Sequence, residues 1–458
     1  MAYIELTKGG SDSRTKGTIS CWVKRSKLGS EQYVWGWGEA NNSDAYLRFD
    51  SGDNIEINCD GAGSVYNSTA LYRDTNAWYH LVFSLDGSNA TANLRRRFWV
   101  NGVQQDEGNG SISTFSSAVM GWLSTQDLWI GANPRSQNGS SISAFDGYIS
   151  HFHYCDGYSY AASDFGETDA VTGEWKIKTE PSVNYGTSGF FCKMENGSNM
   201  DEDSSGNNKT LVTNGTINLS QDNPSNIFAV FNAISNADAT LSNGNTSCLT
   251  NSGTYADRPV MTTLGMTKGK YYCEIKAGTL NTGATWEYGI LGITGRPLKN
   301  VTGSEQYQHL GSVTEDFGYY AFNGHLLNNS GSSNTDTAYG NTWTTNDIIG
   351  IAVDIDNSKL YFSKNGVWQD SGDPTSGATG TGAISIDAVS STTLGAYFFA
   401  VGAYHYTPRY NFYANFGNGY FGTTAVSSAG TNASNIGIFE YDVPAGYTAL
   451  CTKGLNSF

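Results

Sequence analysis

The sequence predicts an all-β protein made of two jelly-roll-type antiparallel β-sandwiches joined by an ordered connector. Short runs that alternate apolar and polar residues recur along both halves of the 458-residue chain, with turn residues between them. The 55 glycines against 8 prolines indicate many turns, and an aromatic content of 13% suits pleated strands. Helical periodicity does not alternate with these strands, which argues against a parallel α/β fold.

We expect the first sandwich to occupy residues 1–160. The sequence Asn101-Gly102 after an aromatic run favours a tight hairpin, because both residues tolerate a positive φ. The strands expected in this half are 18–23, 78–85, 98–100, 128–131 and 147–152.

The middle of the chain, residues 161–231, is rich in Asp, Asn, Ser and Gly. It also carries Trp175, Tyr185, Phe190 and Phe191, which are too many large apolar side chains for a solvated linker. We therefore expect an ordered connector that packs against both sandwiches.

The second sandwich is expected at residues 232–458. An apolar strand, an acidic turn, an aromatic strand and then Asn365-Gly366 repeat the pattern of the first half. The same fold type is thus expected twice, without the regular period of a solenoid. The strands expected here are 270–275, 288–293, 348–353, 359–363, 397–401 and 412–416.

The charge of the chain argues against nucleic-acid binding. Acidic residues outnumber basic ones by 42 to 26, which gives a net charge of −16, whereas contact with phosphates needs clustered Lys and Arg. No run of 18 apolar residues predicts a membrane-spanning helix. The first residues lack the basic start and apolar core of a signal peptide, so we expect folding in a cytoplasm.

The cysteines support the same compartment. The seven cysteines are scattered, with no Cys-x-x-Cys pair and no metal-type spacing. Several of them, such as Cys21 and Cys273, lie in apolar strand patterns. We therefore expect buried free thiols of a protein made in a reducing cytoplasm.

Catalytic motifs are missing, and we expect a protein that is not an enzyme. A glycosidase needs two carboxylates on one face, and the nearest such pair, Glu56 and Asp60, has nothing to distinguish it from turn acids. The sequences Gly-x-Ser-x-Gly and His-Glu-x-x-His are also absent. His151 and His153 share a strand face, but a zinc site would need two further ligands.

One acidic segment resembles the opening of a calcium loop. Asp201, Asp203 and Ser205 place oxygens at alternate positions before Gly206. Position 212, where such a loop ends in Glu, is Val212. Calcium is therefore one interpretation, and an acidic turn without a cofactor is the other.

Aromatic residues are the candidates for ligand contact, because sugar rings stack on Trp and Tyr. Trp35 and Trp37 lie on one face of a predicted strand, with core packing as the alternative. A second group follows the predicted strand 397–401, on a turn at one end of the sandwich where it could equally seal a subunit contact. That group consists of Tyr404, His405, Tyr406 and Arg409.

Two families share motifs with the two halves. The segments "ISCWVKR", "AWYHLVFSLD", "FWVNGVQ" and "FDGYISHFHYCDG" resemble laminin-G/concanavalin A-like domains. The segments "GKYYCEIKAG", "GILGIT", "DIIGIAVDIDNSKLYFSKNGVWQ" and "YANFG" resemble SPRY domains. The resemblance implies two lectin-like sandwiches in this order.

The segments "SYAASDFGETDAVTGEWKIK" and "VPAGYTALCTKGL" resemble tail-fibre-like or spike-like virion proteins of bacteriophages, many of them marine. This resemblance implies a structural protein of a tailed phage, a fibre, spike or capsid appendage assembled in the host cytoplasm and displayed on the particle. Its partners would be other virion proteins and a host cell-surface glycan or receptor. Analogy with phage appendages implies a homo-oligomer, with a trimer favoured. The alternatives are a purely structural adaptor or decoration protein and, less favoured, a polysaccharide depolymerase.

Overall fold

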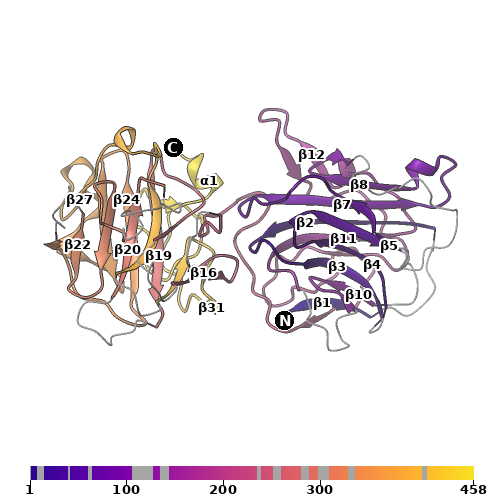
Figure 1. Cartoon of the computed structure of the whole chain (residues 1–458), viewed down its shortest axis with the longest axis horizontal. Coiled ribbons are helices and arrows are strands. Elements are labelled where there is room, and N and C mark those ends of the chain that lie inside the picture. The colour runs from indigo at the N-terminus through magenta and orange to yellow at the C-terminus, as the bar shows by residue number, and fades with distance from the viewer. Residues whose placement is uncertain are drawn as a thin grey trace. The chain divides into compact units, whose positions relative to one another are not determined.

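The computed structural model describes most of the chain as two compact units (Figure 1). The described residues are 2–7, 15–39, 42–59, 64–105, 127–134, 144–234, 239–250, 259–279, 288–297, 309–328, 336–404 and 410–458. Unit 1 comprises Met1–Leu219 with Asn223–Ser225, and unit 2 comprises Ser220–Asp222 with Asn226–Phe458.

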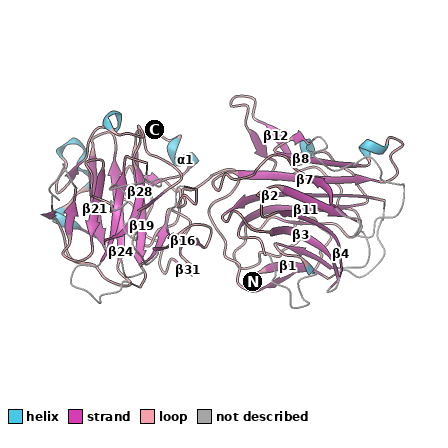
Figure 2. Cartoon of the chain, viewed as in Figure 1, coloured by secondary structure: helices cyan, strands magenta, loops and turns pink. Residues whose placement is uncertain are grey.

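Strands make up nearly all of the regular structure in these residues, which confirms the all-β prediction (Figure 2). The α-helix found among the described residues is the short α1 (Thr452–Leu455). No helix in this part of the chain is long and apolar enough to cross a membrane.

The described residues of unit 1 form two large antiparallel sheets. Among the described residues, the first has the strand order β15 (Val212–Asn214), β1 (Tyr3–Leu6), β10 (Asp127–Ile130), β3 (Gln32–Glu39), β4 (Asn42–Phe49), β5 (Ile55–Cys59) and β6 (Ser64–Asn67). The second has the order β14 (Phe190–Cys192), β11 (Gly147–Asp156), β2 (Lys16–Arg25), β7 (Trp78–Asp86), β8 (Arg96–Val100) and β9 (Val103–Gln104).

The core of unit 1 lies between these two sheets. Alternate side chains of β2, namely Ile19, Cys21 and Val23, enter it, as the period-2 pattern predicts. The predicted hairpin at Asn101-Gly102 has positive φ at both residues, 48° and 78°. Gly102 also lies against the ring of Trp175, which a Cβ at this position would overlap.

The expected connector is not a separate part, because residues 161–219 complete unit 1. β14 pairs with β11 at one edge of the second sheet, and β15 pairs with β1 at one edge of the first. These pairings satisfy backbone groups that a sheet edge would otherwise leave open. The hairpin β12 (Gly166–Thr168) and β13 (Trp175–Ile177) belongs to the same segment.

This segment also buries the outer face of the second sheet of unit 1. Phe165 is buried there against Val82, Trp99 and Cys155, with Trp175 packed on the same cluster. The aromatic residues that predicted an ordered segment are therefore used to cover one sheet.

Unit 2 repeats the two-sheet plan. Among the described residues, one sheet has the order β16 (Ala239–Ser242), β17 (Ser247–Thr250), β29 (Asn411–Asn415), β19 (Lys270–Ala277), β24 (Ile348–Asp354), β25 (Lys359–Lys364) and β26 (Val367–Trp368), with β27 (Ile384–Ser385) on β25 and β32 (Thr448–Ala449) on β19. The other has the order β18 (Val260–Met261), β28 (Phe398–Tyr404), β20 (Tyr288–Thr294), β21 (Asp316–Tyr320), β22 (His325–Leu327) and β23 (Asp336–Ala338).

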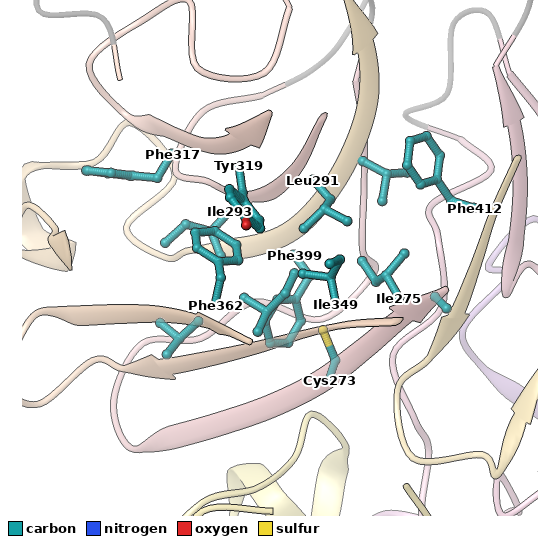
Figure 3. Packing of buried hydrophobic residues seen from close by; sticks show 14 of the residues in the cluster. Cys273, Ile275, Leu291, Ile293, Phe317, Tyr319, Ile349, Phe362, Phe399 and Phe412 are labelled. Atoms are coloured by element: carbon teal, nitrogen blue, oxygen red, sulfur yellow. The ribbon is translucent and has the colours of Figure 1, made fainter. Parts of the chain in front are cut away.

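Large apolar side chains fill the space between the sheets of unit 2 (Figure 3). Cys273 and Ile275 of β19 lie there with Leu291 and Ile293 of β20. Every residue of β24 is buried, which fits its nearly continuous apolar sequence.

The C-terminal residues cover the outer face of the larger sheet of unit 2. Phe439, Val443 and Tyr447 are buried there against Tyr272 of β19. The carboxylate of Glu274 on the same strand accepts hydrogen bonds from the backbone N–H groups of Glu440 and Tyr441, each at 2.8 Å. It also accepts one from the Tyr272 hydroxyl at 3.1 Å. This buried acid thus fastens the C-terminal segment to the sheet.

Six of the seven cysteines have described side chains, and all six are buried and free of disulfides. Burial raises the pKa of the Cys21 thiol above its ordinary value. Such a thiol behaves as a small apolar group and is a poor nucleophile.

Candidate functional site

Trp35 and Trp37 do not offer their rings to a ligand, so this prediction was wrong. Both side chains are 0% exposed and lie in the core of unit 1. The ring of Trp37 meets Tyr154 edge-on, with 5.1 Å between centroids. Strand alternation put both Trp on one face as expected, but that face is the one the second sheet covers.

The second predicted group lies mostly outside the described residues. The backbone of Tyr404 ends β28 and pairs with Tyr288 of β20. His405, Tyr406 and Arg409 lie outside the residues that the structure describes. Recognition by this group stays a prediction.

The acidic segment considered for calcium forms a hydrogen-bonded turn. Asp203 accepts hydrogen bonds from the backbone N–H groups of Ser205 at 2.9 Å and Lys209 at 2.8 Å. Asp201 accepts from both the N–H and the hydroxyl of Thr213, each at 2.8 Å. In the described part of the chain, no group of three or more His, Cys, Asp or Glu side chains could hold a metal ion. These carboxylates therefore stabilise the local turns, and calcium binding by Asp201, Asp203 and Ser205 stays a prediction.

A serine and a histidine in contact also prove to be structural. Nε2 of His80 lies 2.9 Å from Oγ of Ser20, while Trp175 donates its indole N–H to Nδ1 of His80 at 3.0 Å. Because Nδ1 accepts that hydrogen bond, the ring proton is on Nε2 and is donated to Ser20. His80 therefore cannot take a proton from Ser20. The ring is fully buried, and burial lowers the pKa of His80 to about 3.

Of the two carboxylates considered for a glycosidase site, Glu56 and Asp60, the structure describes only Glu56. Asp60 lies outside the described residues. Glu56 is 7% exposed and its Oε2 accepts two hydrogen bonds from Arg48. A carboxylate held in this way is committed to an ion pair.

The outer face of β3, β4 and β5 in unit 1 carries a group of interacting polar and aromatic side chains. We call this group the Tyr–Arg face, and it consists of Glu31, Tyr33, Tyr46, Arg48 and Glu56. Ala45, Leu47 and Phe49 of β4 are buried in the core, so the alternate residues Tyr46 and Arg48 lie on the outer side. The register pairs Arg48 with Tyr33 on β3 and with Glu56 on β5.

Arg48 lies at the centre of the Tyr–Arg face. Its Nε and Nη2 donate to Oε2 of Glu56 at 2.8 and 2.6 Å. Its Nη1 donates to Oε1 of Glu31 at 2.7 Å and to the hydroxyl of Tyr33 at 2.9 Å. Although burial opposes it, hydrogen bonding to Glu56 raises the pKa of Arg48 above its ordinary value, so this cation stays charged.

The two tyrosine rings of this face are locked in place. Their centroids are 5.2 Å apart with the planes at 77°, and the guanidinium of Arg48 lies 5.4 Å from the Tyr33 ring and 5.1 Å from the Tyr46 ring. The Tyr46 hydroxyl donates to Oε1 of Glu56 at 3.0 Å. Burial, with Glu56 beside it, raises the pKa of Tyr46 to about 12. Both rings are half-buried, so they combine a fixed position with an open surface.

Two amide side chains border the Tyr–Arg face. Asn58 of β5 pairs with Tyr46, and Asn67 of β6 pairs with Glu56. Among the described residues, no donor reaches the Oδ1 atom of either amide. Both oxygens are shielded from solvent, so each carries the cost of a buried acceptor without a donor.

The Tyr–Arg face was not among the sequence-based predictions, which selected the Trp pair of 35 and 37 and the aromatic turn after residue 401. The signal was available in the alternation of residues 45–49, where Tyr46 and Arg48 separate three apolar residues. Alternation reveals that these two side chains share a face, but not which residues of the neighbouring strands lie beside them.

Comparison with protein families supports the domain type predicted for each half of the chain. The model of the concanavalin A-like lectin/glucanases superfamily matches residues 1–158, and the SPRY domain model matches residues 270–385. The chain therefore carries a concanavalin A-like domain followed by a SPRY domain, in the predicted order. The bacteriophage part of the resemblance stays a prediction.

Solved structures show a distant likeness to parts of the chain. The SPRY domain of human HERC1 is 16% identical, covers 40% of this chain and 96% of its own, and has a TM-score of 0.28. A putative carbohydrate binding protein from Bacteroides ovatus is 17% identical, covers 47% and 56%, and has a TM-score of 0.33. A heptameric SAP-like pentraxin from Limulus polyphemus is 13% identical, covers 46% and 88%, and has a TM-score of 0.29. Among curated proteins, none matches the chain.

Proposed function

We propose that this chain is a non-catalytic binding protein whose first unit binds a glycan on the Tyr–Arg face. The observation that carries the proposal is the pair of half-buried rings, Tyr33 and Tyr46, fixed by hydrogen bonds to Arg48 and Glu56. A sugar stacks its C–H face on such rings, and rings that are already ordered lose little entropy on binding.

The domain content suits a binding protein. The first half matches a superfamily of lectins and glucanases, and a SPRY domain in the second half suits binding of a protein. Two groups of catalytic type among the described residues are otherwise engaged, since the Ser20 hydroxyl accepts a hydrogen bond from His80 and Glu56 is paired with Arg48.

Replacement of the rings tests the glycan site. We expect Tyr33→Ala and Tyr46→Ala each to weaken glycan binding by about fivefold, because each removes a stacking surface worth roughly 1 kcal/mol. Binding is measured on a glycan array and then by titration calorimetry with the best ligand. Tyr158→Ala, at a tyrosine that is 39% exposed and outside the face, is the matched control. Unchanged binding in both ring variants, with normal melting curves, would remove the site.

We propose further that the protein is displayed on a tailed bacteriophage particle, as a fibre, spike or capsid appendage that contacts the host surface. What supports this is the resemblance of residues 159–178 and 443–455 to phage virion proteins. Its partners would then be other virion proteins and a host glycan or receptor. Antibody labelling of purified particles under the electron microscope tests it, and particles without label at any position would contradict it.

A further inference from the structure

We infer that the Tyr–Arg face selects neutral glycans and excludes acidic ones. The inference rests on the proposed glycan site and names the class of sugar that this site takes. It follows from how the donors and charges of the face are already used.

Most N–H donors of Arg48, the cation of the face, are already engaged in hydrogen bonds. A guanidinium has five N–H donors, and an acidic sugar would be recognised through two of them in parallel. In Arg48, Glu56 takes the Nε donor and one Nη2 donor. Glu31 and Tyr33 take the two hydrogen bonds that Nη1 donates. One donor remains, which cannot form a bidentate pair with a sugar carboxylate.

The net charge of the face is negative. Arg48 contributes +1, while Glu31 and Glu56 contribute −1 each, so the three sum to −1. A carboxylate or sulfate that lands on the rings therefore meets repulsion, which favours neutral over acidic sugars on the order of tenfold at low salt. The chain as a whole has a net charge of −16, which adds in the same direction.

The face also presents an acceptor, which suits a hydroxyl group. Glu31 is 44% exposed at its side chain and uses Oε1 for Arg48, which leaves Oε2 for a ligand donor. A neutral sugar supplies both of the required surfaces, hydroxyl donors at its rim and a C–H face for the rings.

The test measures binding of the full chain to immobilised polysaccharides. The neutral probes are dextran, mannan and arabinogalactan, and the acidic probes are alginate, polygalacturonate and polysialic acid. We expect at least one neutral probe to bind about tenfold more tightly than every acidic probe, and to lose binding in the Tyr33→Ala Tyr46→Ala double variant. Acidic probes that bind as well as neutral ones, through the same two rings, would overturn the inference and leave the glycan site intact.

A charge variant isolates the cause. Glu31→Gln makes the face neutral but replaces one acceptor oxygen with an N–H donor, so we expect neutral probes to bind more weakly, acidic probes to bind more tightly, and the preference for neutral probes to shrink several-fold. Glu174→Gln, at an exposed glutamate of the β12–β13 turn, is the control and should change nothing. An unchanged preference in Glu31→Gln would overturn the electrostatic reasoning. Failure of all six probes, or binding that ignores the two rings, would remove the proposed glycan site itself and the inference with it.

Discussion

Mild acid should lower the stability of unit 1 and raise the stability of unit 2. In unit 1, burial lowers the pKa of His80 to about 3, that of His151 to about 4, and that of His153 well below its ordinary 6.5. In the unfolded chain these rings take up protons near pH 6.5. Their contribution to stability is therefore complete above pH 6.5 and is lost as the pH falls toward the folded-state values.

Burial also raises the pKa of Glu274 in unit 2, here to about 7 from an ordinary 4.5. The folded state thus binds a proton more readily than the unfolded chain does. The contribution of Glu274 to the stability of unit 2 is complete below pH 4.5 and is lost as the pH rises through 7. Unit 2 should gain stability over the same interval in which unit 1 loses it.

The size of the effect follows from linkage. Between pH 7 and pH 5 each buried histidine costs unit 1 about 2 kcal/mol, and three of them at most about 6 kcal/mol. Over the same range Glu274 stabilises unit 2 by about 2 kcal/mol. The pKa values of paired aspartates such as Asp53 and Asp86 are lowered. These aspartates change the stability only in more acidic solution, so they do not affect the comparison between pH 7 and pH 5.

Hydrogen-exchange mass spectrometry during urea unfolding at pH 7 and pH 5 assigns each transition to its unit. We expect the midpoint of unit 1 to fall and that of unit 2 to rise on acidification. Glu274→Gln should abolish the rise in unit 2 and leave unit 1 as it was. A unit 1 midpoint that stays constant or rises between pH 7 and pH 5 would refute the reasoning from the buried histidines.

Four further outcomes are expected. Arg25 and Asp53 form a buried ion pair at 3.0 Å, so Asp53→Asn should destabilise unit 1 by about 3 kcal/mol in urea unfolding, and a loss below about 1 kcal/mol would contradict this. Alkylation under denaturing conditions without reductant should label all seven thiols, as read by mass. Light scattering at micromolar concentration should give the mass of a trimer, and the mass of a monomer would contradict this expectation. Replacement of Tyr404 and Tyr406 by Ala should reduce host adsorption while particle incorporation stays normal, whereas lost incorporation would indicate a subunit contact.

The alternation of apolar and polar residues determined the two sandwiches, because the side-chain period of a strand is a local property. It gave the strands that became β2, β7 and β24, and the Asn-Gly pairs gave two hairpin turns in the left-handed region, with φ of 48° at Asn101 and 49° at Asn365. The family motifs added the order of the two domains, which the family models support.

Tertiary structure alone decided which face of each strand is covered. Alternation alone would put Tyr33 on the same face as Trp35 and Trp37. The register between β3 and β4 shifts between Tyr33 and Trp35, so the two Trp became core while Tyr33 stayed half-buried on the outer side. It also decided that residues 161–219 belong to unit 1, through pairing with strands far away in the chain. The Tyr–Arg face arises in the same way, since Arg48 meets Glu56 and Tyr33 only when three strands lie in register.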